Sequence, residues 1–171
     1  MAGLKPEIVQ EQPFFSVEEE ALLNLLRTAD ALHRAFHRKT RDWGVTSTQY
    51  NVLRILRGAH PQGLICSAIG TRMITAEPDI TRLLSRLKTL KLVRQQRDRH
   101  DRRVVWTQIS ASGLQLLKEM DPVIQQLPVE LLGQLDKSEL AEFIRLLERA
   151  RAGSEDSLGP VSCEGERCNE G

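Results

Sequence analysis

The stretch from Thr75 to Ile109 constrains the fold of this chain more than any other part of the sequence. From Asp79 to Val93, apolar residues recur at the i, i+3, i+4 and i+7 spacing of one buried helix face. They are Ile80, Leu83, Leu84, Leu87 and Leu90. Polar residues fill the opposite face. The pattern therefore predicts a helix that packs one side on a core and leaves the other side open to a partner.

A strongly basic hairpin is expected directly after this helix. Residues 93–96 and 104–109 have the composition of two strands, and the seven residues between them are too charged to be core. From Arg72 to Arg103, ten Lys or Arg residues stand against four Asp or Glu. This is a local balance of +6 in a chain whose net charge is +1. Such a concentration of positive charge is expected of a protein that neutralises phosphates, so the stretch indicates nucleic-acid binding.

Further elements are predicted on both sides of this stretch from capping signals and apolar periodicity. On the N-terminal side we expect a first helix from Ser16 to about Asp42, with Ser16 and Glu19 forming a capping box at its start. A second helix is expected from Thr46 or Ser47 to Gly58. A short strand at Leu64 and Ile65 and a third helix over residues 67–73 follow. Thr75 is expected to cap the fourth helix, with Pro78 in its first turn.

Two helices are predicted after the hairpin. The fifth begins at Ser110 or Ser112, and Pro122 and Pro128 are expected to bend or interrupt it. The sixth begins at Asp136, which with Glu139 forms a capping signal, and ends near Gly153.

The fold class follows from these elements and from the composition. With seven aromatic residues in 171, the core must be mainly Leu, Ile, Val and Ala, which suits helices. Two helices joined by a short turn and followed by a hairpin predict a winged helix-turn-helix. We expect a mainly α (α+β) fold of six helices with a two-stranded β wing.

These segments resemble the multiple-antibiotic-resistance regulator (MarR) family of winged helix-turn-helix transcription factors. The similarity covers about residues 17–150. It rests on the ordered combination of Asp79-Ile80-Thr81-Arg82-Leu83-Leu84, Arg86-Leu87, Leu92-Val93-Arg94, Asp101-Arg102-Arg103 and Ser110-Ala111-Ser112-Gly113. The chain departs from the family at Lys91, where glycine is usual, and in a longer, more acidic tail.

The resemblance implies an obligate homodimer. Residues 16–43 and 110–152 would form the dimerisation helices, and residues 44–109 the DNA-binding domain. Composition, not the resemblance, predicts an N-terminal arm for residues 1–15 and a disordered acidic tail for residues 153–171. Each fourth helix would enter a major groove of a pseudo-palindromic operator, and each wing the adjacent minor groove. In many relatives a small, often phenolic, ligand binds between the dimer helices and the winged domain and lowers DNA affinity. The expected function is a repressor that a small molecule releases from its operator.

Eleven residues are predicted to contact double-stranded DNA: Pro78, Thr81, Arg82, Ser85, Arg86, Thr89, Arg97, Arg99, His100, Arg102 and Arg103. Arg82 is expected to reach a base edge, whereas Thr81 and Ser85 could equally hold phosphates. Arg99 or Arg102 is assigned to the minor groove, and Asp101 is expected to structure the wing as the partner of Arg103. The alternative for the helical residues is an ordinary solvated face.

A ligand site is predicted more weakly. His33, His37, Trp43 and Tyr50 offer polar tips on apolar bodies near the expected ligand cleft. For each of them, packing in a core or dimer interface is the alternative. One helical turn separates His33 from His37, a spacing that can also bind a metal, but the sequence suggests no third ligand. We therefore expect neither a metal nor a cofactor.

Other classes of protein find little support in the sequence. No phosphate-binding glycine loop, nucleophile elbow or paired carboxylate indicates an enzyme. No signal peptide is apparent, and no apolar run is long enough to span a membrane. Three cysteines make no disulfide framework, so a cytoplasmic protein is expected. Cys66 is expected to be a small buried hydrophobe, while Cys163 and Cys168 could form a disulfide or sense redox state. A protein-binding winged helix and a non-specific architectural DNA-binding protein remain as alternative functions.

Overall fold

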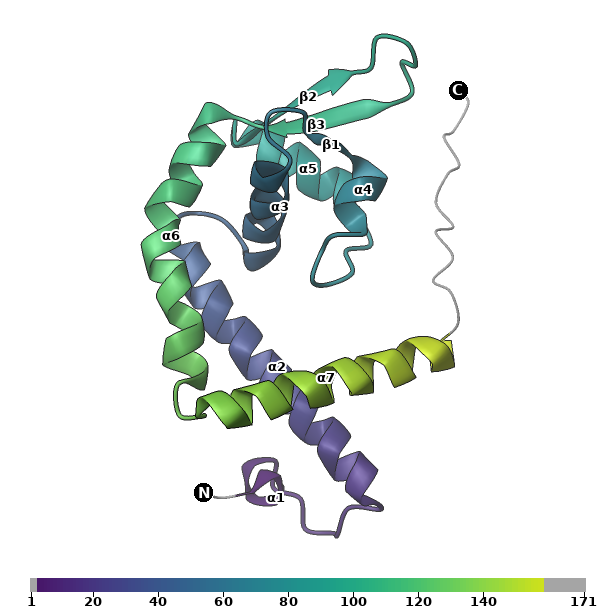
Figure 1. Ribbon diagram of the computed structural model, residues 1–171, viewed down its shortest axis with the longest axis vertical. Coiled ribbons are helices and arrows are strands. Elements are labelled where there is room, and N and C mark those ends of the chain that lie inside the picture. Colours follow the sequence, from purple (N-terminus) through teal and green to yellow (C-terminus); the bar gives the residue numbers. More distant parts are fainter. Residues whose placement is uncertain (1–2, 159–171) are drawn as a thin grey trace. The chain divides into compact units, whose positions relative to one another are not determined.

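The computed structural model describes residues 3–158 and contains seven helices and three strands in that range (Figure 1). The elements are α1 (Leu4–Glu7), α2 (Val17–Arg41), α3 (Ser47–Gly58), β1 (Leu64–Ile65), α4 (Cys66–Gly70), α5 (Ile80–Thr89), β2 (Val93–Arg97), β3 (Val105–Ile109), α6 (Ala111–Leu132) and α7 (Lys137–Leu158). The predicted mainly α winged-helix class is confirmed. The helix beyond the predicted six is α1, which lies within the expected arm.

The chain divides into two compact units, residues 1–128 and residues 129–171. In the first unit, β1, β3 and β2 form an antiparallel sheet in that order. Val93 pairs with Ile109 and Arg97 with Val105, while Leu64 of β1 pairs with Thr107. The predicted short strand at Leu64 and Ile65 is thus confirmed. It makes β3 the central strand and anchors the hairpin that carries the wing.

The core of the first unit joins α3, α4 and α5 to the sheet and to α6. Its fully buried side chains are Val52, Leu53, Leu56, Ile69, Leu87, Ile109, Leu117 and Met120. Burying an aliphatic side chain contributes about 1.5 to 3 kcal/mol, so this cluster fixes how α5 and the hairpin are held. A 2.7 Å ion pair between Arg57 of α3 and Asp121 of α6 adds a polar link at the core's edge.

Most of the predicted caps are confirmed. Ser16 Oγ accepts a bond from the Glu19 N–H at 3.2 Å, but the Glu19 carboxylate accepts from Phe15 instead of closing the box on Ser16. Thr46 and Gln49 form a complete capping box at α3. At α7, Asp136 and Glu139 bond each other's backbone N–H groups at 2.8 and 2.9 Å.

The predicted fourth helix corresponds to α5, and both of its predicted ends were wrong. Its cap is Asp79, not Thr75, because Asp79 Oδ1 accepts the Arg82 N–H at 2.8 Å; Pro78 therefore precedes the helix. The helix ends at Thr89, not Val93. Lys91 adopts a left-handed φ of 59°, the Lys91 N–H bonds the Lys88 carbonyl, and the Leu92 N–H bonds the Leu87 carbonyl, which is a Schellman motif.

The Schellman motif that ends α5 explains two further observations. Lys91 occupies the left-handed position that favours glycine, and it does so without preventing the motif. Leu90, placed by periodicity on the buried face, is instead 48% exposed, because the chain leaves the helix at this residue.

Two other predicted boundaries also differ. The predicted third helix is α4, which covers Cys66–Gly70 instead of residues 67–73. Of the bend or interruption expected at Pro122 and Pro128, an interruption is excluded, because α6 is continuous through both and its buried stripe of Leu117, Met120, Ile124 and Leu127 offsets the lost backbone bonds. Helix α7 continues past Gly153 to Leu158, so its predicted end near Gly153 is wrong. Residues 159–171, with Cys163 and Cys168, lie outside the described residues.

Cys66 carries a free thiol and packs against the core. It is half-buried, whereas a buried residue was expected. None of the helices within residues 3–158 combines the length and apolar character that crossing a membrane requires.

Candidate nucleic-acid interface

Helix α5 presents the predicted polar face to solvent. Leu83, Leu84 and Leu87 are buried on its inner side. The predicted DNA-contacting residues of this helix and of the turn before it are all exposed: Pro78, Thr81, Arg82, Ser85, Arg86 and Thr89. Asp79 caps the helix, so the positions of the first turn are fixed by backbone geometry. The arrangement offers two guanidinium groups and short hydroxyl side chains on one accessible surface.

The wing brings the remaining predicted residues together at the end of the β2–β3 hairpin (Figure 1). Arg97 ends β2, and Arg99, His100, Arg102 and Arg103 follow in the loop; all five are exposed. The Asp98 N–H bonds the Val104 carbonyl at 2.9 Å, and the Val104 N–H bonds the Asp101 carbonyl at 3.0 Å. The loop is thus a closed turn that displays cations.

Asp98 is the residue that organises this turn, and the sequence reasoning missed it. Its carboxylate accepts the backbone N–H groups of His100 and Asp101 and the indole N–H of Trp106. These bonds, the one from His100 first, lower the pKa of Asp98, so the group is charged at neutral pH. An Asp that starts a turn commonly bonds N–H groups two or three residues later, and that signal was present in the sequence.

Asp101 also structures the wing, but not in the predicted way. Its Oδ1 accepts the backbone N–H of Arg103 at 2.9 Å. The expected ion pair with the Arg103 guanidinium is not found within residues 3–158. Arg103 is therefore exposed like the other wing arginines.

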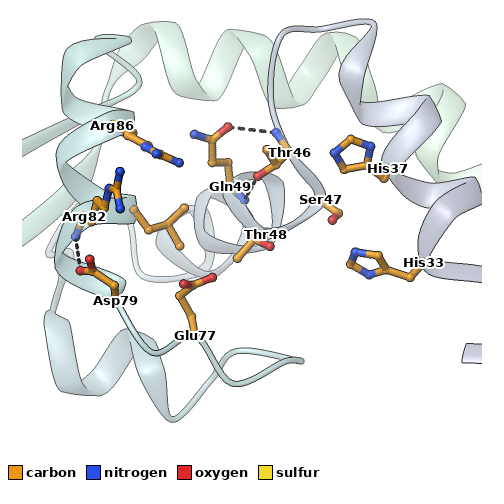
Figure 2. A pocket seen from close by; sticks show the side chains of 11 residues that line it. His33, His37, Thr46, Ser47, Thr48, Gln49, Glu77, Asp79, Arg82 and Arg86 are labelled. Carbon is orange, nitrogen blue, oxygen red and sulfur yellow. Dashed lines mark hydrogen bonds between the residues drawn. The ribbon is translucent and has the colours of Figure 1, made fainter. Parts of the chain in front are cut away.

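A polar cavity of about 380 Å³ lies between α2 and α5, with the start of α3 along it (Figure 2). His33 and His37 of α2 line one side, and Arg82 and Arg86 of α5 the other. Thr46, Ser47, Thr48, Gln49, Glu77, Asp79 and Leu83 complete the lining. Two arginines of the predicted DNA-contacting face therefore also border a cavity large enough for a small molecule.

Trp43 and Tyr50 do not join the two histidines at this cavity. Tyr50 is buried in the core, with its ring 5.5 Å from that of Phe36 and 6.0 Å from the Arg54 guanidinium. Burial raises the pKa of the Tyr50 phenol. Trp43 packs half-buried against the same core. Among the described residues, no group of three His, Cys, Asp or Glu side chains is placed to hold a metal ion.

Comparison with known proteins agrees with this geometry. The MarR family model matches residues 43–104, which hold α3 to α5, β2 and most of the wing. The transcriptional repressor NicR of Pseudomonas putida is 32% identical over 143 residues, covering 82% of this chain and 87% of NicR. The chain belongs to the MarR family. Like other members of this family of transcription regulators, it combines a winged helix-turn-helix with long flanking helices.

Two solved structures extend the comparison of this MarR family protein. A MarR transcription factor from Planctomyces limnophilus is 39% identical, with a TM-score of 0.63, and covers 80% of this chain and 98% of its own. BpsR of Bordetella bronchiseptica is 24% identical, with a TM-score of 0.69 over 78% of this chain and 99% of its own. At this identity, the likeness to BpsR shows only that the two proteins share a fold.

Proposed function

We propose that this MarR family protein is a dimeric, operator-specific transcription repressor whose DNA affinity falls when a small molecule binds. The observation that carries the proposal is the exposed surface formed by α5 and the wing, with all eleven predicted DNA-contacting residues on it. Its relative NicR is a transcriptional repressor. A protein-binding winged helix has no need of this local charge.

The two parts of the surface have different tasks in this proposal. Helix α5 enters the major groove, where Arg82 forks onto a guanine edge and Thr81 and Ser85 bond phosphates. The wing places Arg99 or Arg102 in the adjacent minor groove, whose negative potential attracts guanidinium groups.

Dimerisation sets the distance between the two recognition helices. The N-terminal half of α2 exposes Leu22, Leu25 and Leu26, which a monomer would leave in water. In the second unit, α7 exposes Ile144 and Leu146. We assign residues 16–43 and 110–152 to the dimerisation helices and residues 44–109 to DNA binding. The proposal assigns no catalytic role, and a regulator that binds chromosomal DNA acts in the cytoplasm.

The cavity beside α5 is the proposed ligand site. Because Arg82 and Arg86 line it, a small aromatic acid bound there would draw the same guanidinium groups that DNA needs. Such a ligand binds the DNA-incompetent arrangement better than the competent one and so shifts the population away from the operator. BpsR, which shares the fold, is regulated in its DNA binding by 6-hydroxynicotinic acid.

The proposal predicts that the protein binds tightly to a two-fold symmetric DNA duplex selected from a random library. It also predicts tight binding to the DNA upstream of the protein's own coding sequence, if that DNA contains such a symmetric site. Gel shifts over a salt series are expected to give an affinity at least about 1,000-fold above that for random duplex, with a steep salt dependence. Sedimentation should show one dimer per site. Equal affinity for selected and random DNA would instead identify an architectural protein, and no binding to either would identify a protein-interaction module.

The ligand site is tested by His37→Ala, which alters the cavity without touching the DNA-contacting set. Ligand-free operator affinity is expected to stay within about twofold of the parent, while the 6-hydroxynicotinic acid concentration that releases half the DNA rises about tenfold, corresponding to one lost polar contact. His60→Ala, an exposed histidine outside the cavity, is the matched control. Parallel loss of ligand response in both variants would contradict the assignment.

A further inference from the structure

Among residues 3–158, one side-chain hydrogen bond connects the wing loop to the sheet. Asp98 Oδ1 accepts the N–H groups of His100 at 2.8 Å and Asp101 at 3.2 Å, which shapes the loop itself. The second oxygen, Oδ2, accepts the Trp106 indole N–H at 3.0 Å. One carboxylate thus uses one oxygen for the turn and the other for a strand.

The two ends of this bond are held very differently. Trp106 lies on the central strand β3, where its backbone pairs with Gln96 on one side and Ile65 on the other. Its side chain is half-buried. Residues 99–103 are all exposed, so apolar burial does not fix the loop. The indole is therefore the rigid end of the bond and the loop the adaptable end.

The charge of the wing makes such a connection useful. Arg97, Arg99, Arg102 and Arg103 lie within seven residues, and their mutual repulsion favours open arrangements of the loop. Ordering an open loop on DNA costs conformational entropy that a pre-formed loop does not lose. Asp98 and Trp106 also line a hollow of about 340 Å³ with Arg97 and Arg99, so the bond lies beside the guanidinium groups it would orient.

We propose that the hydrogen bond from Trp106 to Asp98 sets the conformation of the wing loop, and that Trp106 and Asp98 are positioning residues for operator binding. The proposal rests on the proposed function, because it requires the wing arginines to contact DNA. Neither residue needs to touch DNA itself. The bond acts by keeping the arginine-bearing loop in its binding arrangement.

The first test is Trp106→Phe, which keeps most of the ring and removes only the N–H donor. Operator affinity is expected to fall about tenfold, while the slope of log affinity against log salt stays unchanged because every cation remains. Gln108→Met is the matched control, since Gln108 lies on the same strand and lines the same hollow, but donates its side-chain bond to the Gln62 carbonyl and not to Asp98. The control should stay within about twofold of the parent.

A double-mutant cycle with Asp98→Asn separates the bond from general effects on folding or charge. Asparagine keeps one oxygen for the turn but turns an N–H₂ group toward the indole, so the connection is already lost. In this background Trp106→Phe is expected to change operator affinity less than twofold. An equal tenfold loss in both backgrounds would overturn the proposal, as would parental affinity for Trp106→Phe alone.

A third variant keeps this result distinct from failure of the proposed function. Arg99→Ala combined with Arg102→Ala should weaken binding and lower the salt slope by about one for each phosphate contact removed. If this variant binds like the parent, neither Arg99 nor Arg102 contributes to DNA binding and the proposed function is wrong in that part. If it loses binding while Trp106→Phe does not, only the positioning role is wrong.

Discussion

Replacing Arg82 with alanine is expected to weaken operator binding about 10- to 100-fold per half-site, the largest effect of any single substitution on the surface. Arg82 is exposed in the first turn of α5, where the Asp79 cap fixes the backbone. A bidentate contact from arginine to guanine contributes about 1 to 3 kcal/mol of discrimination between bases. Affinity for random duplex should fall much less, so the specificity ratio falls with it. Gel shifts with selected and random duplexes measure both.

Two further variants define what the Arg82 result means. Arg82→Lys keeps the charge but not the planar fork, so it is expected to retain affinity for random DNA and lose operator specificity. Lys118→Ala removes an exposed cation from α6, outside the DNA-contacting set, and should bind within about twofold of the parent when sedimentation shows the same dimer. Parental operator affinity for Arg82→Ala would show that another side chain reads the base. Because Arg82 also lines the cavity, ligand is left out of these measurements.

Replacing Gly113 with alanine is expected to lower the free energy of unfolding by about 1 to 3 kcal/mol, the usual cost of overpacking. Gly113 is buried in the first turn of α6. A Cβ there would overlap the Leu92 carbonyl oxygen and lie 2.8 Å from Ile109 Cγ1. The same carbonyl accepts the Ser110 N–H, and Ser110 Oγ accepts the Gly113 N–H, so neither backbone segment can shift freely.

The sign of the Gly113 effect is informative because helix propensity alone predicts the opposite. Within a helix, alanine is favoured over glycine by about 1 kcal/mol. At Gly58, the last residue of α3, a Cβ would meet no atom of the described residues within 4 Å, so Gly58→Ala should leave stability unchanged or raise it. Urea unfolding at one fixed protein concentration compares the two variants, since a dimer's stability depends on concentration. A Gly113→Ala protein as stable as the parent would contradict the packing argument.

The sequence predicted those parts of the structure that short-range rules control. The stripe of Leu83, Leu84 and Leu87 depends only on helical periodicity, and the cap at Thr46 and the capping pair of Asp136 with Glu139 depend on residues at most three positions apart. The exposure of the predicted DNA-contacting residues on α5 follows from the same periodicity, and that of the wing residues from their charge. Their contacts with DNA remain predictions.

The sequence was less informative where several local solutions compete. Thr75 and Asp79 are both acceptable helix caps, and Asp79 forms the cap because its side chain reaches the Arg82 N–H. Periodicity extended α5 through Leu90, while the Schellman motif around Lys91 ends it earlier. Such competition depends on small backbone energies that a residue pattern does not resolve.

The tertiary structure alone decided which distant residues meet. The cavity brings His33 and His37 of α2 to Arg82 and Arg86 of α5, whereas Tyr50, equally plausible from its chemistry, is buried against Phe36. In the wing, the indole of Trp106 lies within hydrogen-bond distance of Asp98 and donates to its carboxylate, which distinguishes Asp98 from Asp101. Side-chain type and spacing determine each element and its buried face. The partner across a core or a sheet is set by how all the elements pack together, and no local pattern contains that information.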